Sequence, residues 1–128
     1  MDFNLSNEQK LIRETAREFA QNELLKGVID RDENKEFPTN QVKKMGEMGF
    51  LGMMVSPEYG GGGMDTISYV LAMEEISKID ASCSVIMSVN NSLVCWGIEK
   101  YGSQEQKDKY LKPLATGQII GAFCLSEP

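Results

Sequence analysis

The sequence contains no histidine among its 128 residues. Ser-His and Cys-His nucleophilic systems are therefore excluded, together with the commonest zinc ligand. Cysteine is also scarce, with only Cys83, Cys95 and Cys124. Their odd number and their spacings do not match a disulfide framework or a zinc site. We predict reduced thiols and no metal site, so any chemistry must use carboxylates, hydroxyls or a bound cofactor.

Positive charge is in short supply as well. Lysine and arginine number 13 against 19 aspartates and glutamates, which leaves a net charge of −6. Such a surface repels phosphate backbones, so we predict no nucleic-acid partner. The opening residues MDFNLSNEQK lack a basic stretch followed by an apolar run, which predicts no signal or transit peptide and a cytoplasmic protein.

No charged residue occurs from Ala81 to Ile98, which indicates a central helix. A membrane span needs about 20 predominantly apolar residues. This stretch is interrupted by small polar residues, so we predict no membrane span: Ser82, Ser84, Ser88, Asn90, Asn91 and Ser92. Hydroxyl and amide groups among aliphatic side chains suit either tight helix packing or a pocket for an apolar ligand with a polar end, and the pattern leaves both readings open.

Helix signals dominate the first 117 residues. Two capping boxes, which satisfy free backbone N–H groups, mark helix starts at Ser6 with Gln9 and at Ser103 with Gln106. Asp80 is a further N-cap candidate, and Pro113 should end the last helix just after Lys112. Apolar periodicity predicts helices from residue 7 into the mid-twenties and over about 38–49, 67–79, 81–98 and 104–112. The expected fold is all-α, an orthogonal bundle of about five to six helices.

The character of the chain changes after Gly117. Ile119, Ile120, Phe123 and Leu125 form a short apolar run that predicts one strand. A single strand cannot satisfy its own backbone groups, so this segment is expected to be the first strand of a truncated β-domain. The predicted organisation is a helical domain over residues 1–117 and the start of a β-domain over residues 118–128.

Two motifs that could carry chemistry have simpler readings. Gly60 to Gly63 could cradle a phosphate, but Met64 and Asp65 stand where a P-loop needs lysine and serine or threonine, which favours an ordinary loop. Glu74 and Glu75 are adjacent on a predicted helix, where their directions differ by about 100°. We therefore predict a solvated or interface position for them instead of an acid–base pair.

These signals fall in an order that resembles the acyl-CoA dehydrogenases over the whole chain. The matching segments are FP at 37–38, MGFLGMMVSPEYGGGG at 48–63, MEEISKIDAS at 73–82, NSL at 91–93 and YGSQEQKDKYLKPLATGQIIGAFCLSEP at 101–128. The most specific are the EYGG loop, the YGSQEQKDKYLKPLATG block and the closing LSEP. The similarity is greatest to bacterial short-chain enzymes of the butyryl-CoA type.

The resemblance implies an FAD-dependent oxidoreductase of fatty acid and butyrate metabolism. Such a flavoprotein oxidises short-chain acyl-CoA to trans-2-enoyl-CoA and passes electrons to an electron-transfer flavoprotein. The family has an amino-terminal helical domain, a central β-domain, and a carboxy-terminal domain that carries the catalytic glutamate and drives tetramer formation. This chain matches the first part, so we expect no catalytic residue in it, no activity from the fragment alone, and self-association as a homo-oligomer.

The resemblance also implies two groups of site residues. Three match the family segment that touches the flavin: Cys124, Leu125 and Ser126. Four match the helix that floors the acyl pocket: Asn91, Ser92, Val94 and Cys95. Two other readings stay open, namely a stand-alone helical binding or interaction module, and an acyl-CoA oxidase, which uses the same scaffold but lets oxygen reach the flavin.

Overall fold

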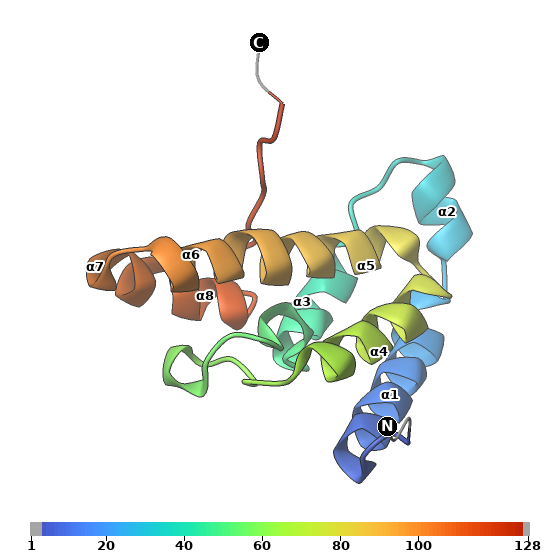
Figure 1. The fold of residues 1–128 in the computed structure, drawn as a ribbon. Coiled ribbons are helices and arrows are strands. Elements are labelled where there is room, and N and C mark those ends of the chain that lie inside the picture. Colours follow the sequence, from blue (N-terminus) through green and yellow to red (C-terminus); the bar gives the residue numbers. More distant parts are fainter. Residues whose placement is uncertain (1–3, 127–128) are drawn as a thin grey trace.

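The computed structural model describes residues 4–126, and these residues form an all-helical bundle with no strand (Figure 1). Its elements are α1 (Asn7–Phe19), η1 (Ala20–Leu24), α2 (Val28–Glu33), α3 (Thr39–Glu47), η2 (Phe50–Gly52), η3 (Pro57–Tyr59), α4 (Thr66–Ser77), α5 (Ala81–Ser88), η4 (Val89–Cys95), α6 (Trp96–Tyr101), α7 (Gln104–Gln106), η5 (Lys107–Leu111) and α8 (Lys112–Ala115). Because the π-helical turns η1, η4 and η5 join their neighbours, the described chain has six continuous helices, over residues 7–24, 28–33, 39–47, 66–77, 81–101 and 104–115. The expected helical bundle is confirmed.

The larger hydrophobic core lies where α1 and α4 pack together and meet α3 and α5. Its fully buried side chains include Leu24, Met45, Leu51, Ile76 and Met87. Each large aliphatic side chain removed from water contributes roughly 1.5–3 kcal/mol. The helices around this core are therefore held mainly by their apolar faces, and their relative positions are fixed.

The long helix from Ala81 to Tyr101 runs across the whole bundle (Figure 1). Asp80 caps its start, accepting a hydrogen bond from the backbone N–H of Cys83 at 3.0 Å, as the sequence predicts. Length and composition alone would let these 21 residues, with a mean hydropathy of 1.3, cross a membrane. Core helices of water-soluble proteins meet the same criterion, and Cys83, Met87 and Cys95 of this helix are fully buried within the bundle.

A second, smaller core lies between the far end of this helix and the last helix. It contains Val55, Cys95, Leu111, Leu114 and Ala115. The prediction that Pro113 ends the last helix is wrong, because α8 continues to Ala115. Pro113 lies directly after the π-helical turn η5 within one continuous helix, at a place where the regular hydrogen-bond ladder is already interrupted.

The loop between η2 and α4 contains the predicted glycine run. Gly62 donates to the Gly52 carbonyl at 2.9 Å, and Gly63 donates to the Val55 carbonyl at 2.8 Å. A Cβ at Gly61 would lie 2.1 Å from the carbonyl oxygen of Val55, so only glycine permits this approach. The reading of this segment as an inter-helix loop is confirmed.

The exit segment, residues 119–126, leaves the bundle in an irregular, extended form (Figure 1). The strand expected here is not formed within residues 119–126, and positions 127 and 128 of the expected segment lie outside the described residues. The physical reason is the one that applies to any lone strand, since its N–H and C=O groups need a neighbouring strand and the described chain offers none.

Candidate functional site

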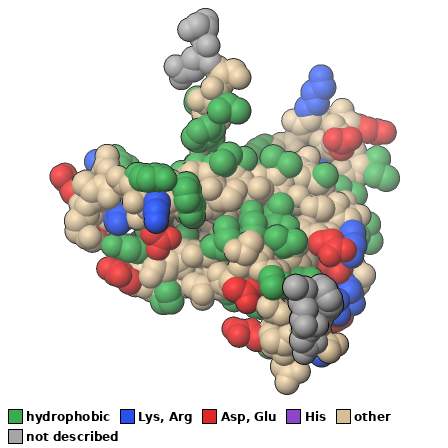
Figure 2. All heavy atoms as spheres, in the orientation of Figure 1, with side chains coloured by type: hydrophobic (Ala, Val, Ile, Leu, Met, Phe, Trp, Pro, Cys, Tyr) green, Lys and Arg blue, Asp and Glu red, His purple; other side chains and the backbone are tan. Residues whose placement is uncertain are grey.

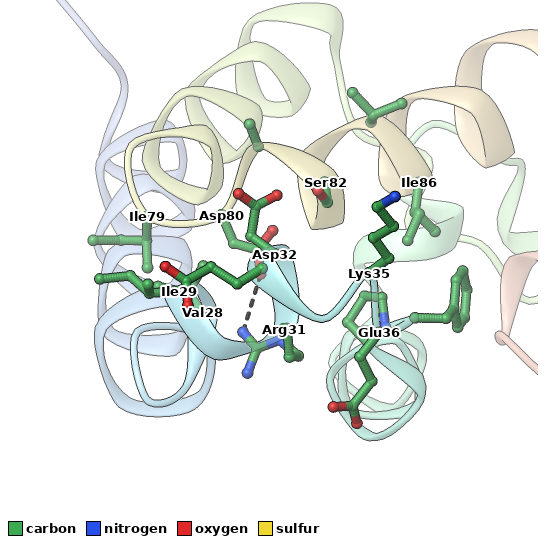
Figure 3. Close-up of a pocket in the computed structure, with 15 residues that line it drawn as sticks. Val28, Ile29, Arg31, Asp32, Lys35, Glu36, Ile79, Asp80, Ser82 and Ile86 are labelled. Atoms are coloured by element: carbon green, nitrogen blue, oxygen red, sulfur yellow. Dashed lines mark hydrogen bonds and ion pairs between the residues drawn. The ribbon is translucent and has the colours of Figure 1, made fainter.

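A hollow lies between α2 and the start of α5, and none of the predicted site residues lines it. Its volume is about 980 Å³, with apolar walls that include Ile29, Val85 and Ile86 (Figure 3). Two of the six charged residues that line it are paired with each other, because Arg31 Nη2 lies 3.1 Å from Asp80 Oδ2. The same guanidinium also donates to two carbonyls at the end of the preceding helix. Arg31 and Asp80 therefore bond to backbone groups at helix ends and are not free to bind a ligand.

The four predicted pocket residues lie together in η4, where they divide between two sides of the helix. Asn91 and Cys95 are buried in the bundle. Asn91 donates to the carbonyl oxygens of Phe50 at 2.8 Å and Met87 at 3.0 Å. Ser92 and Val94 are only partly buried, and the Ser92 hydroxyl donates to the Ser88 carbonyl at 2.7 Å. Of the four predicted residues, only Ser92 and Val94 are therefore accessible from outside the bundle.

The outer side of the long helix is an uncharged apolar surface. Val85, Leu93 and Trp96 are 58%, 45% and 50% exposed. Figure 2 shows hydrophobic side chains gathered over the middle of this face of the molecule and along the exit segment. An exposed apolar surface of this kind typically marks a binding site or an interface, and Leu93 and Trp96 were missing from the residues predicted for the pocket.

The three predicted cofactor residues lie in the exit segment. Cys124, Leu125 and Ser126 are exposed, and Leu125 is 81% so. Residues 122–126 make no hydrogen bond to the rest of the described chain. Their backbone N–H and C=O groups and the Ser126 hydroxyl can thus meet the hydrogen-bonding edge of a planar polar ring.

The exit segment meets the long helix at Gly121, which lies on the predicted Val94 and bonds to Asn90; sequence reasoning missed both Gly121 and Asn90. A Cβ at Gly121 would lie 2.6 Å from Val94 Cγ1, so the exit segment lies directly on the long helix. Asn90 Oδ1 accepts a hydrogen bond from the Gly121 N–H at 2.9 Å. The only sequence signal for Asn90 is a second amide beside Asn91 in an uncharged helix, and that signal names no partner.

The ionisable groups Cys83, Cys95 and Asp80, in or next to the long helix, have shifted pKa values that come from burial and local hydrogen bonds. Burial raises the pKa of the Cys83 thiol and of the Cys95 thiol to about 12, so both stay protonated at neutral pH. Burial alone would raise the pKa of Asp80, but hydrogen bonds from the Cys83 N–H and from Arg31 outweigh it and hold the pKa below its usual range. Within residues 4–126, no three His, Cys, Asp or Glu side chains are grouped as a metal site.

Comparison with known proteins gives the family. Residues 6–118 match the model of the acyl-CoA dehydrogenase amino-terminal domain. A short-chain-specific acyl-CoA dehydrogenase of Clostridium acetobutylicum is 49% identical over 128 residues, which are all of this chain and 34% of that protein. The chain belongs to the acyl-CoA dehydrogenase family, as its motifs predict, and it spans about a third of the length of the curated relatives it matches.

Solved structures agree with this assignment. Butyryl-CoA dehydrogenase from Megasphaera elsdenii superimposes with a TM-score of 0.92 at 35% identity, covering 100% of this chain and 34% of that one. A glutaryl-CoA dehydrogenase from Mycobacterium smegmatis in complex with FADH2 gives a TM-score of 0.92 at 36% identity, covering 97% and 32%. The helical bundle is therefore the fold of this family's amino-terminal part.

Proposed function

We propose that this chain is the amino-terminal part of an FAD-dependent dehydrogenase that oxidises short-chain acyl-CoA to trans-2-enoyl-CoA. The observation that carries the proposal is the 49% identity to a short-chain-specific enzyme over the entire chain. In the proposed organisation, residues 1–117 form the helical domain and residues 118–128 begin the β-domain. The protein would act in the cytoplasm, with an electron-transfer flavoprotein as electron acceptor and a homo-oligomer as its assembled form.

Each group of site residues has one task in this proposal. Ser92 and Val94 are partly exposed and would line the floor of the acyl pocket, with the exposed Leu93 between them. Asn91 and Cys95 are buried on the side of η4 that faces the bundle, and their contacts there would hold the backbone of η4 in place. An uncharged apolar floor excludes water from a short alkyl chain and offers no partner to a charged one.

The exit segment would hold the cofactor. Free N–H and C=O groups of residues 124–126, with the Ser126 hydroxyl, would hydrogen-bond the pyrimidine edge of the flavin. When bound, FAD supplies the hydride acceptor for the β-hydrogen of the acyl group. The protein contributes alignment, since hydride transfer needs the alkyl chain and the ring held close together.

The base that removes the α-proton is assigned to a part of the family's sequence that this chain does not contain. Glu75 is, with Asp80, one of the two most buried carboxylates of the described residues, but it is engaged by Arg17 and Lys78. Those contacts lower its pKa, with the Arg17 hydrogen bond as the largest cause, and this makes it a poor proton acceptor near neutral pH. We therefore expect no turnover from these 128 residues alone.

The test uses the product of the native gene that contains this sequence, purified with FAD. Anaerobic addition of butyryl-CoA should bleach the flavin absorption band, and octanoyl-CoA should bleach it more slowly. A colourless product that no acyl-CoA affects would overturn the proposal in favour of a binding module. Rapid recovery of the band on admitting oxygen would instead identify an oxidase.

A second measurement isolates the contribution of this chain. The 128-residue protein is incubated with FAD, desalted, and its visible spectrum recorded. We expect a colourless protein, because residues 122–126 provide hydrogen bonds to one edge of the ring only. A retained flavin band would show that the helical part builds a cofactor site without the rest of the enzyme.

A further inference from the structure

Asn90 occupies an unusual position in the middle of the long helix. Its side chain is completely buried, with 0% exposure. Nδ2 donates to the carbonyl oxygens of Leu51 at 2.8 Å and Leu114 at 3.1 Å. Oδ1 accepts from the Gly121 N–H at 2.9 Å. One amide thus connects the long helix to three segments that are distant in sequence: η2, α8 and the exit segment.

Gly121 is fixed from a second direction by Val94. A Cβ placed at position 121 would lie 2.6 Å from Val94 Cγ1 and 2.8 Å from Val94 Cβ. Both distances are far below van der Waals contact, so any other residue would push the exit segment off the helix. The backbone of Gly121 is therefore held between the buried amide of Asn90 and the side chain of Val94.

Gly121 is also the last point at which the described exit segment hydrogen-bonds the bundle. Exposure rises beyond it, from 52% at Phe123 to 81% at Leu125. Three residues of extended chain span at most about 10 Å. The location of Cys124 relative to the floor of η4 is therefore limited by where Gly121 is held.

We propose that Asn90 is a positioning residue that sets the distance between the cofactor segment, residues 124–126, and the pocket floor at Ser92 and Val94. Its hydrogen bond to Gly121, together with the contact of Gly121 on Val94, holds the two groups as one unit. The roles of those two groups rest on the function proposed above. The anchoring itself does not, and it can be measured on this chain without flavin or substrate.

The chain offers its own probe for this measurement. Cys124 is exposed, whereas Cys83 and Cys95 are buried, so a thiol spin label attaches to Cys124 in the folded protein. A second label on Lys100→Cys, an exposed position of α6, gives a distance from the exit segment to the long helix by pulsed electron resonance. Amide exchange of residue 121, followed by NMR, reports the hydrogen bond directly.

The first variant is Gly121→Ala, which leaves the bundle core untouched. Its Cβ should displace the exit segment, broaden the label distance, and speed amide exchange at residue 121 by about fivefold, the loss expected for one hydrogen bond of ordinary strength. The thermal midpoint should fall by only a few degrees, because one hydrogen bond is lost and no core side chain is removed. Adding Val94→Ala creates the missing space, so the double variant should recover the narrow distance and the slow exchange.

Asn90→Ala is compared with Asn91→Ala, a matched change at the next residue. Both amides are buried and both bond to backbone carbonyls of η2, so both variants should lower the thermal midpoint. Only Asn90→Ala should broaden the label distance, because Asn91 makes no bond to the exit segment.

A narrow, unchanged distance in Gly121→Ala would overturn the proposal, as would a double variant that fails to recover it. Equal broadening of the label distance in Asn90→Ala and Asn91→Ala would also overturn it, since the broadening would then come from general destabilisation. If Asn90→Ala and Asn91→Ala do not fold, the comparison of Gly121→Ala with the Gly121→Ala, Val94→Ala double variant still tests the proposal. Failure of the proposed function would appear separately, as an absence of flavin reduction in the longer protein.

Discussion

Arg17 of α1 donates hydrogen bonds from two guanidinium nitrogens to the carboxylate of Glu75 in α4. Nε lies 3.1 Å from one carboxylate oxygen of Glu75 and Nη2 lies 3.2 Å from the other, and Lys78 adds a third contact at 3.0 Å. The Glu75 side chain is 6% exposed, whereas its neighbour Glu74 is 57% exposed. The two adjacent glutamates thus face different ways, as their helical spacing predicts, and one of them joins the two helices of the larger core.

The first prediction concerns the pH dependence of stability. The Arg17 hydrogen bond holds the pKa of Glu75 below its unfolded value, so Glu75 contributes stability that is present above that value and is lost as pH falls through the folded pKa. The unfolding free energy should therefore fall as pH drops below about 4.3, the usual pKa of glutamate. Glu75→Gln should cost about 1–3 kcal/mol at pH 7 and flatten this dependence.

Urea unfolding at several pH values checks this, with Glu74→Gln as the control. Glu74 is exposed and pairs only with Lys78 at the surface, so its loss should have little effect. Equal losses in the two variants at pH 7 would contradict a special role for the buried carboxylate.

The second prediction concerns thiol reactivity. Cys83 and Cys95 are buried, with pKa values raised to about 12 by that burial, whereas Cys124 is exposed. A thiol reagent at pH 8 should therefore modify one cysteine per folded chain and all three after denaturation. Mass spectrometry counts the adducts, and Cys124→Ser should leave the folded chain unmodified. Modification of a second thiol at a similar rate would contradict the buried positions.

The third prediction uses two glycines around which a Cβ would have open space. Gly49 has a φ of 80°, a conformation that alanine adopts only with strain, so Gly49→Ala should destabilise the protein by about 1 kcal/mol. Gly97 lies within α6, where Gly97→Ala should stabilise it by about 0.5–1 kcal/mol. Urea midpoints should move in opposite directions, and a shift of the same sign in both would contradict one of the two backbone conformations.

The fourth prediction concerns association. Trp96, Phe123 and Leu125 are 50%, 52% and 81% exposed, so apolar surface is available to a second copy. Sedimentation should therefore show a mass that rises with concentration. Replacing Phe123 and Leu125 with glutamate should weaken the association. Leu11→Glu, at an exposed apolar position of α1, is the control and should leave it unchanged.

Local signals in the sequence predict much of this fold. The capping boxes at Ser6 and Ser103 are both formed, with each serine accepting from the backbone N–H three residues later. Such contacts involve residues a few positions apart, so they can be inferred without knowing the tertiary structure. The all-helical class and the placement of the glycine loop follow in the same way.

Contacts between distant residues could not be predicted. The bond from Gly121 to Asn90 joins positions 31 apart, and no pattern in either segment indicates the other. The site residues were identified from a resemblance to the family. The structure gives their positions, and their roles stay predictions. The missing strand at residues 119–126 has a related cause, since an apolar run indicates a tendency to form a strand but not the presence of a partner.

The π-helical turn η4 has a consequence for the long helix as a whole. Four of its five fully buried residues, namely Cys83, Met87, Asn91 and Cys95, recur at every fourth position, and the fifth is Asn90. In a regular α-helix, each step of four advances by about 40° beyond a full turn, so this row would wind away from the core. The wider π turn absorbs that excess and keeps the row in line past both cores. A π turn holds one residue more than the α-helical turn it replaces, so deleting one residue from 89–95 should return this segment to a regular α-helix and leave Cys95 facing the second core.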